Sequence, residues 1–334
     1  KIFSAIECLN QRLSGGYAVV SLIANHGLIG FRDPFGIRPL VLGKKTASDG
    51  FNSYMLASES CTLTSNGFEL IRDVLPGEAI IISLTGELSS QICHANPSLN
   101  LCIFEYVYLA RPDSIMEQVP IQSARRQMGK YLAKTIQKSH PNLAVDVVIA
   151  VPDLARTVAI ATADELGKPY HEGFVKNHLM NNDDYTQNTA QSQAATLSSL
   201  SPINLEFKDK NVLLVDISVV RGNNSREIIS MVRAAGAKKV YFASAAPKIQ
   251  YSSVYGVDMP VYTQLIAHNR NDQQIAEKIG ADLIIYQTLA DLKQALRDIN
   301  PELHNFEASC FDGYYITQDI DENYLQSLAN GVNH

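Results

Sequence analysis

Short apolar runs separated by turn residues dominate the first 90 residues of the chain. Four of them are expected to form strands: residues 17–23, 27–31, 54–57 and 79–83. Asn25 and His26 lie between the first two runs, and this spacing predicts a β-hairpin. A short segment with several strands needs a further layer to pack against. The pattern therefore predicts a β-rich segment over residues 1–90.

The rhythm changes after a connecting segment that we place at residues 91–120. Residues 123–138 carry an apolar side chain at every fourth position from Ala124 to Ile136, which predicts an amphipathic helix. A second stripe at the same spacing is basic and consists of Arg126, Lys130, Lys134 and Lys138. We interpret this basic stripe as a face of the helix that is exposed to solvent.

Apolar runs and helical segments then alternate as far as residue 299. Strands are predicted at 145–151, 211–215, 240–245 and 283–286, and helices at 157–166, 225–235, 275–279 and 289–299. This alternation predicts a parallel sheet with helices in its crossovers. Ligands of such sheets bind beyond the carboxyl ends of the strands. The loops expected to carry function are therefore 152–156, 216–224 and 246–250.

One stretch of the chain, residues 180–206, has an unusual composition. It is rich in Asn, Gln, Ser and Thr and contains no Lys or Arg. A segment of this kind buries too little apolar surface to offset the entropy lost on ordering. We therefore expect residues 180–206 to form a mobile loop.

Length, charge and cysteine content exclude several classes of protein. The chain has 334 residues, which allows about two domains, and its net charge is −6. An acidic chain does not suit general binding to nucleic acids or to anionic membranes. The five cysteines form no CxxC pair, and no apolar run is long enough to cross a membrane. We expect a cytoplasmic globular protein without nucleic-acid or membrane partners.

The segment with the clearest chemical signal is NVLLVDISVVRGNNS, residues 211–225. An apolar strand ends at Asp216, a loop follows, and a helix begins near Ser225. Free backbone amides at the start of a helix, approached closely because Gly222 has no side chain, form a pocket for anions. An acid just before such a pocket suits ribose hydroxyl groups or a metal ion. An ordinary loop between strand and helix is the alternative interpretation.

This loop resembles the phosphoribosyl pyrophosphate (PRPP) signature of type I phosphoribosyltransferases. The surrounding segments are similar to those of glutamine PRPP amidotransferases across nearly the whole chain: FRDPFGIRPLVLG (31–43), ASES (57–60), RDVLPGEAI (72–80), FEYVYLARPDS (104–114), GKPYHEGFVKN (167–177), GAKKVYFASAAP (236–247), YGVDMP (255–260) and LIAH (265–268). The resemblance implies an α/β fold in which a parallel-sheet phosphoribosyltransferase domain follows a β-rich N-terminal-nucleophile (Ntn) glutaminase domain.

The resemblance also implies a division of the chain into four parts. These are a truncated glutaminase remnant at 1–90, the connector at 91–120, the transferase domain at 121–300 and a C-terminal segment at 301–334. In the family, the nucleophile of the glutaminase is the N-terminal cysteine, and this sequence begins at Lys1, partway through that domain. Cys8 is internal and is expected to be a buried structural thiol.

In the family, ammonia displaces pyrophosphate from C1 of PRPP and gives phosphoribosylamine. The PRPP-binding residues that the resemblance implies are Lys176, Asp153, Asp216, Ser218, Val219, Val220, Arg221, Gly222, Asn223, Asn224 and Ser225. Arg156 is either an assisting cation or an arginine exposed at the start of a helix. A homo-oligomer, with PRPP or a purine nucleotide as ligand, is also implied.

Four residues depart from the family pattern in ways that weaken a Mg²⁺ site. The second acid of the motif is Ile217, the threonine pair is Asn223-Asn224, and a threonine of the pyrophosphate loop is Leu154. Of the residues that would hold the metal in the family, only Asp216 then remains, so we expect Mg²⁺ to bind weakly or not at all. Some family members hold an iron–sulfur cluster. Cys102 falls near one of its positions, but the C-terminal match is only Ala308-Ser309-Cys310, so no cluster is expected.

Two hypotheses follow from these substitutions. The first is an amidophosphoribosyltransferase of purine biosynthesis whose turnover is impaired or lost. The second is a non-catalytic relative that keeps the fold and binds a nucleotide or phosphate, or acts as a scaffold. The backbone amides of the loop do not depend on the replaced side chains, so phosphate binding is expected to outlast turnover.

Overall fold

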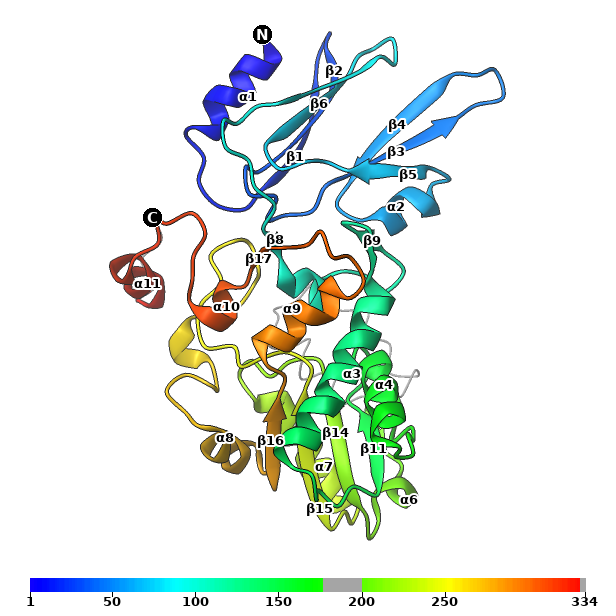
Figure 1. The fold of residues 1–334 in the computed structure, drawn as a ribbon, viewed down its shortest axis with the longest axis vertical. Coiled ribbons are helices and arrows are strands. Elements are labelled where there is room, and N and C mark those ends of the chain that lie inside the picture. Colours follow the sequence, from blue (N-terminus) through cyan, green and yellow to red (C-terminus); the bar gives the residue numbers. More distant parts are fainter. Residues whose placement is uncertain (177–199, 331–334) are drawn as a thin grey trace. The chain divides into compact units, whose positions relative to one another are not determined.

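The computed structural model describes residues 1–176 and 200–330, which fall into two compact units (Figure 1). The first unit comprises residues 1–124 and 252–259 and the chain from residue 296 onward. The second unit comprises residues 125–251 and 260–295. The four domain ranges read from the sequence stay a prediction.

The first unit contains two antiparallel sheets, with strand orders β1-β2-β6-β7 and β4-β3-β5. Their strands are β1 Ala18–Ile23, β2 Gly27–Arg32, β3 Val41–Thr46, β4 Asn52–Ala57, β5 Glu69–Asp73, β6 Glu78–Ile82 and β7 Leu88–Ile92. β1 and β2 form the predicted hairpin, with Ile23 opposite Gly27 and Asn25 in the left-handed conformation at φ 62°. Asn adopts this conformation more readily than most residues. The predicted β-rich character of residues 1–90 is confirmed.

Two apolar clusters hold the first unit together. Residues from both sheets form one of them, which includes Leu42, Leu56 and Ile80. Helix α1 (Ile2–Asn10) contributes Ile6 to the second cluster. The residues of α1 that are buried are Ile6 and Asn10, one helical turn apart, and this face leaves Cys8 exposed. The expectation of a buried thiol at Cys8 is therefore wrong.

The segment from 91 to 120 contains short regular elements. They are β8 Leu101–Cys102, a π-helical turn Glu105–Leu109, β9 Ile115–Met116 and β10 Val119–Pro120. Ile103, Tyr106 and Val107 have no exposed surface. β8 pairs in parallel with β17 (Phe306–Glu307), so this segment belongs to the core of the first unit. The remaining helices of this unit are α2 Ser60–Ser65, α10 Ser309–Asp312 and α11 Glu322–Ala329.

The second unit is built on a parallel sheet with the strand order β11-β14-β15-β16. Its strands are β11 Val147–Ala150, β14 Asn211–Asp216, β15 Lys239–Ser244 and β16 Leu283–Tyr286. All three pairings are parallel, which confirms the predicted α/β sheet. Ala150 lies opposite Val215, and therefore the loops that follow β11 and β14 leave the same edge of the sheet side by side.

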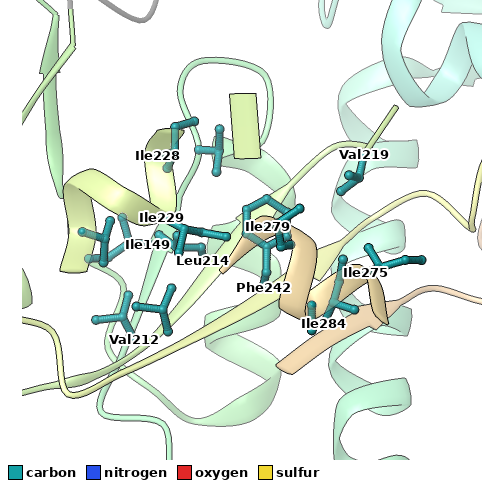
Figure 2. Close-up of a cluster of buried hydrophobic side chains, with 14 of the residues drawn as sticks. Ile149, Val212, Leu214, Val219, Ile228, Ile229, Phe242, Ile275, Ile279 and Ile284 are labelled. Carbon is teal, nitrogen blue, oxygen red and sulfur yellow. The ribbon is translucent and has the colours of Figure 1, made fainter. Parts of the chain in front are cut away.

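Three helices lie between successive strands of this sheet: α4 Arg156–Leu166, α7 Asn223–Ala234 and α8 Asp272–Ile279, the last preceded by a 3₁₀ turn at Tyr262–Gln264. α3 Ile121–Ser139 precedes β11, and α9 Leu289–Arg297 follows β16. Alternate strand residues such as Leu214 and Phe242 pack against Ile229 of α7 and Ile279 of α8 (Figure 2). α4 also contacts β11 and β14, and none of its residues belongs to this cluster. Helices α7 and α8 thus cover one face of the sheet and α4 the opposite face, because strand side chains alternate between faces.

Helix α3 has the two faces that its sequence predicts. The side chains at 124, 128, 132 and 136 are buried, whereas the basic stripe at 126, 130, 134 and 138 is exposed. Thr162 of α4 donates a hydrogen bond of 3.0 Å to the carbonyl of Gly129, which fixes the two helices against each other. No helix in the described part of the chain is long and apolar enough to cross a membrane.

The expected mobile loop at 180–206 is wrong at its C-terminal end. Residues 200–202 form β13 (Leu200–Pro202), which pairs with β12 (Phe174–Lys176), and α6 (Asn204–Phe207) follows. Phe207 is fully buried, and its ring centroid lies 5.3 Å from that of Phe174. This aromatic contact offsets the polar composition of the segment. Residues 180–199 lie outside the described part of the chain.

Candidate functional site

The loop between β14 and α7 brings Asp216 and Gly222 to the carboxyl edge of the parallel sheet. β14 ends at Asp216, and α7 begins at Asn223 with Gly222 as its N-cap residue. Gly222 has a φ of +79°, a conformation that glycine adopts without strain. A Cβ atom at this position would lie 2.2 Å from Cδ1 of Ile266. The close approach of the backbone to Ile266 therefore requires glycine.

Two carbonyl groups of this loop accept hydrogen bonds from neighbouring loops, whereas the amides of residues 218–222 have no partner among the described residues. The carbonyls of Ile217 and Val220 accept hydrogen bonds of 2.9 and 2.8 Å from the amides of Ala246 and Ile266. The N–H groups of residues 218–222 donate to no other residue of the described chain. A row of unpaired amides leading into a helix N-terminus is the arrangement that binds a phosphate group. The geometry thus supports the predicted anion pocket.

Asp216 is half-buried at the end of β14 and has very few polar contacts. Its Oδ1 atom accepts a hydrogen bond of 2.7 Å from the amide of Ile217. Burial raises the pKa of Asp216 to about 7, and this hydrogen bond opposes the rise only in part. Near neutral pH the carboxyl group is therefore divided between its protonated and ionised forms. It can accept from ribose hydroxyls when ionised, and it is a weak metal ligand when protonated.

Replacing Asp216 by asparagine is expected to stabilise the second unit above pH 7. An ordinary aspartate ionises near 3.8, and Asp216 ionises near 7. As the pH rises from about 4 to about 7, the wild type therefore loses folding stability. The variant has no carboxyl group at this position and keeps that stability. The full shift is equivalent to about 4 kcal/mol, and local relaxation should reduce the gain to about 1–2 kcal/mol. Urea titrations at pH 5 and pH 8 measure it, and equal gains at both values would contradict the argument.

The structure brings two further predicted residues together at the neighbouring loop. Nζ of Lys176, at the end of β12, lies 3.9 Å from Oδ2 of Asp153, in the loop after β11. The side chains of both residues are about half exposed. Nε of Arg156 lies 3.0 Å from Oε1 of Glu172, so this arginine is paired as well as exposed. Both cations at this loop thus have a carboxylate partner.

The remaining predicted residues of the loop differ in what they present. Val219 is buried in the apolar cluster of Figure 2, so only its backbone is available to a ligand. Ser225 is also buried, whereas Asn223 and Asn224 are exposed at the first turn of α7. Nη2 of Arg221 donates 3.1 Å to Oε1 of Gln264. The binding roles predicted for these residues, and for Ser218 and Val220, stay predictions.

The positions that depart from the family pattern do not supply a metal site. Ile217 is buried, whereas the side chain of Leu154 is 40% exposed. Across residues 1–176 and 200–330, no group of three His, Cys, Asp or Glu side chains is placed to hold a metal ion.

Cys102 and Cys310 are both buried in the first unit, and desolvation raises the pKa of each thiol well above its usual value. Such thiols stay protonated near neutral pH.

Sequence reasoning missed two residues beside the predicted site, Tyr170 and Glu172. Tyr170 pairs with Val148 of β11 in a parallel bridge, and its hydroxyl donates 2.9 Å to Oε1 of Glu172. Burial and the carboxylate of Glu172 raise the pKa of Tyr170 to about 12. The segment GKPYHEGFVKN resembles the family, yet its pattern alone assigns no role to its acid or its tyrosine. The signal that could have identified them is their closeness in the sequence to Lys176, a predicted ligand-binding cation.

Curated relatives match almost the whole chain, although no family model matches it. The amidophosphoribosyltransferase of Escherichia coli is 48% identical over 327 residues, which cover 98% of this chain and 65% of that protein. Its counterpart in Pseudomonas aeruginosa is 46% identical over 332 residues, covering 99% and 66%. The Saccharomyces cerevisiae protein is 44% identical over 331 residues, covering 98% and 64%. The chain thus spans slightly less than two thirds of the length of each of these relatives.

Two solved structures share the fold. One is the glutamine PRPP amidotransferase of B. subtilis in complex with ADP and GMP, with a TM-score of 0.82 and 31% identity, and the match covers 97% of this chain and 70% of that chain. The other is described as the allosteric regulatory enzyme of purine biosynthesis, with a TM-score of 0.83 and 30% identity, and its coverage is 98% and 68%. Identity and coverage on this scale show that the chain belongs to the amidophosphoribosyltransferase family.

Proposed function

We propose that this chain carries the transferase half of amidophosphoribosyltransferase, in which ammonia converts PRPP into 5-phosphoribosylamine, the first step of purine biosynthesis. The observation that supports this proposal most directly is the row of unpaired amides at 218–222 beside Asp216, in a chain 48% identical to an amidophosphoribosyltransferase. In the reaction the nitrogen lone pair forms a bond to C1 as the bond from C1 to the pyrophosphate oxygen breaks. The electron pair leaves with pyrophosphate, and the nitrogen then loses a proton.

Each group around the loop has a role in this proposal. The amides of residues 218–222 bind the 5′-phosphate, and Asn223 and Asn224 add side-chain hydrogen bonds. Ionised Asp216 accepts from the ribose hydroxyls and holds C1 in place. Lys176 contacts the pyrophosphate, whose charge grows as the bond to C1 breaks, so this lysine favours the transition state over the bound substrate.

We further propose that turnover by this chain is impaired. Bound Mg²⁺ would neutralise the charge of the pyrophosphate and orient it. The described residues do not fit a protein-held Mg²⁺ site, because Asp216 is a single carboxylate with a raised pKa and its neighbour is Ile217. Magnesium is usually held by one or two carboxylates together with substrate phosphates, so a single carboxylate that is partly protonated near neutral pH would hold the ion only weakly. Removing a single group that stabilises charge in the transition state lowers the rate on the order of a hundredfold.

The alternative function is binding of a purine nucleotide or phosphate without turnover. The B. subtilis relative was solved with ADP and GMP, and amides 218–222 suit the phosphate of a nucleoside monophosphate as well as that of PRPP. We also propose that the chain forms a homo-oligomer and is located in the cytoplasm, with the enzymes that use phosphoribosylamine. Light scattering of the purified chain measures the oligomer.

Titration calorimetry with PRPP, with and without Mg²⁺, tests the proposal beside an assay of pyrophosphate release driven by ammonia. We expect PRPP to bind with an affinity that Mg²⁺ changes by less than about threefold, and pyrophosphate release to be slow. The double variant Ile217→Asp, Leu154→Thr should make binding depend on Mg²⁺, because it returns a carboxylate and a hydroxyl to the loops. The variant Ile217→Asn, Leu154→Thr is the matched control, since it adds no charge at a position that is buried in the wild type.

The outcomes separate the hypotheses. Binding of PRPP with slow release supports an impaired transferase, whereas binding of GMP and PRPP with no release supports the non-catalytic alternative. Failure to bind PRPP, GMP or ribose 5-phosphate at millimolar concentration would contradict both. Rapid release by the wild type would show that the altered positions are not needed for catalysis.

A further inference from the structure

Two sets of contacting side chains lie at the loop after β11, the pair Lys176 and Asp153 and the group Arg156, Glu172 and Tyr170, and we call these five residues the loop ion-pair cluster. Arg156 begins α4, Asp153 precedes it, and Lys176 ends β12. Tyr170 is held beside β11 by its bridge with Val148, and the amide of His171 donates 3.1 Å to the carbonyl of Val148. The cluster therefore sits on backbone that is tied to the edge of the parallel sheet.

Within this cluster each cation faces an acid. Lys176 Nζ lies 3.9 Å from Asp153 Oδ2, and Arg156 Nε lies 3.0 Å from Glu172 Oε1. The hydroxyl of Tyr170 donates 2.9 Å to the same carboxylate oxygen of Glu172 and so limits where Glu172 can move. All four charged side chains are 44–63% exposed, so an anion from solution can reach the cations. Formally the cluster carries no net charge.

We propose that Asp153 and Glu172 are specificity-determining residues that compete with the anionic ligand for Lys176 and Arg156. This inference rests on the proposed function, because it concerns the pyrophosphate end of the same site. An incoming pyrophosphate group must separate Lys176 from Asp153 and accept the like charge of both carboxylates nearby. The cluster thereby weakens binding of free polyanions relative to ligands with a single phosphate, which amides 218–222 can hold without these cations.

The size of the effect follows from the spacing and the exposure. Two unit charges 4 Å apart in a water-like environment interact with an energy equivalent to about a fivefold change in an equilibrium constant. Exposed pairs are also screened by salt within about 10 Å at 0.1 M. We therefore expect removal of one acid to tighten pyrophosphate binding by about 3–10-fold at low salt. The gain should shrink as the ionic strength rises.

The experiment measures the dissociation constants of inorganic pyrophosphate and ribose 5-phosphate by calorimetry at 20, 100 and 300 mM salt. The variants are Asp153→Asn, Glu172→Gln and their combination, all without Mg²⁺. Each single variant should tighten pyrophosphate binding by about 3–10-fold at 20 mM salt, and the double variant by at least tenfold. Ribose 5-phosphate binding should change by less than twofold, because the 5′-phosphate site lies at the neighbouring loop.

Two matched controls separate competition from other effects. Glu206→Gln removes one negative charge from the same unit, where Glu206 pairs with His171 and Lys210, at 2.5 and 3.4 Å. It should leave pyrophosphate binding within twofold. Tyr170→Phe keeps every charge and frees Glu172 from its hydrogen bond, so its effect should be smaller than that of Glu172→Gln. Lys176→Ala should weaken pyrophosphate binding in every background.

The outcomes distinguish this inference from the proposed function. If the wild type binds pyrophosphate and the variants Asp153→Asn and Glu172→Gln bind it with the same affinity, the inference is overturned and the proposed function stands. An equal gain in Glu206→Gln would overturn it too, because the effect would then come from net charge. Absence of binding of both ligands by every variant would overturn the inference and the proposed function together.

Discussion

Replacing Arg32 by methionine is expected to lower the free energy of unfolding of the first unit by about 3–5 kcal/mol. Arg32 has no exposed surface. Its guanidinium donates 2.6–2.8 Å to the carbonyls of Gly36, Arg38 and Val74 and to Oε1 of Glu117. Methionine matches the stem of arginine but leaves three carbonyls and a carboxylate without their donor. Uncompensated buried groups of this kind are among the most destabilising changes in a protein.

The loss should grow as the pH rises above 6. Burial and the charge of Glu117 raise the pKa of Asp73 to about 6, and Arg32 opposes that rise. Above pH 6 the variant must therefore hold ionised Asp73 without its cation, whereas at pH 5 the group is protonated. Urea titrations at pH 5 and pH 8, followed by circular dichroism, measure both effects.

Arg111→Met is the matched control for Arg32→Met. Arg111 pairs with Asp113 at 2.9 Å, and both side chains are more than half exposed. Exposed pairs contribute between zero and about 1 kcal/mol, so this variant should differ from the wild type by less than that. A change of less than 1 kcal/mol in Arg32→Met would show that water enters the space and satisfies the buried groups.

The burial of Arg32 illustrates which parts of the fold the sequence left hidden. FRDPFG predicts a turn, and the amide of Gly36 does donate 3.0 Å to the carbonyl of Asp33. Nothing in that segment indicates a buried arginine, because one partner, Glu117, lies 85 positions later in the chain. The local sequence therefore indicates the turn but not the interaction that fixes it.

The parallel sheet was predictable because burial on both faces gives each strand a continuous apolar run. β16 has the bounds that were predicted, and β14 extends its prediction by Asp216 alone. The same reasoning failed at 200–206, where β13 and α6 depend on Phe207 packing against Phe174. It failed at Cys8 because the face of α1 that packs is set by Ile6.

The candidate site divides in a similar way. Asp216 and Gly222 were identifiable because a strand that ends in an acid, followed by a glycine before a helix, predicts a local geometry without help from distant residues. The ion pairs of the loop cluster were not predictable, because Arg156 and Glu172 meet only when residues 169–171 run beside β11. The raised pKa of Asp216 also depends on burial by distant residues rather than on the motif.

Replacing Gly222 by alanine is expected to destabilise the second unit by about 2–5 kcal/mol and to weaken ribose 5-phosphate binding by more than tenfold. The φ of +79° costs an alanine roughly 1–2 kcal/mol. The new Cβ would lie 2.2 Å from Cδ1 of Ile266, and overpacking of this kind costs about 1–3 kcal/mol more. Relief of the clash requires the loop to move, which displaces the amides of residues 218–222 from any phosphate they hold.

Two companion variants separate the backbone cost from the clash. Gly167→Ala adds a Cβ at a φ of +61° with no atom within 4 Å, so it reports the backbone cost alone, about 1–2 kcal/mol. Ile266→Val removes the Cδ1 atom that the alanine meets, and the combination with Gly222→Ala should recover about 1 kcal/mol or more and part of the ribose 5-phosphate affinity. Denaturant titration and calorimetry measure both quantities. If Gly222→Ala matched Gly167→Ala in stability while keeping wild-type affinity, the loop would tolerate the side chain, and the anion pocket would not depend on the close approach to Ile266.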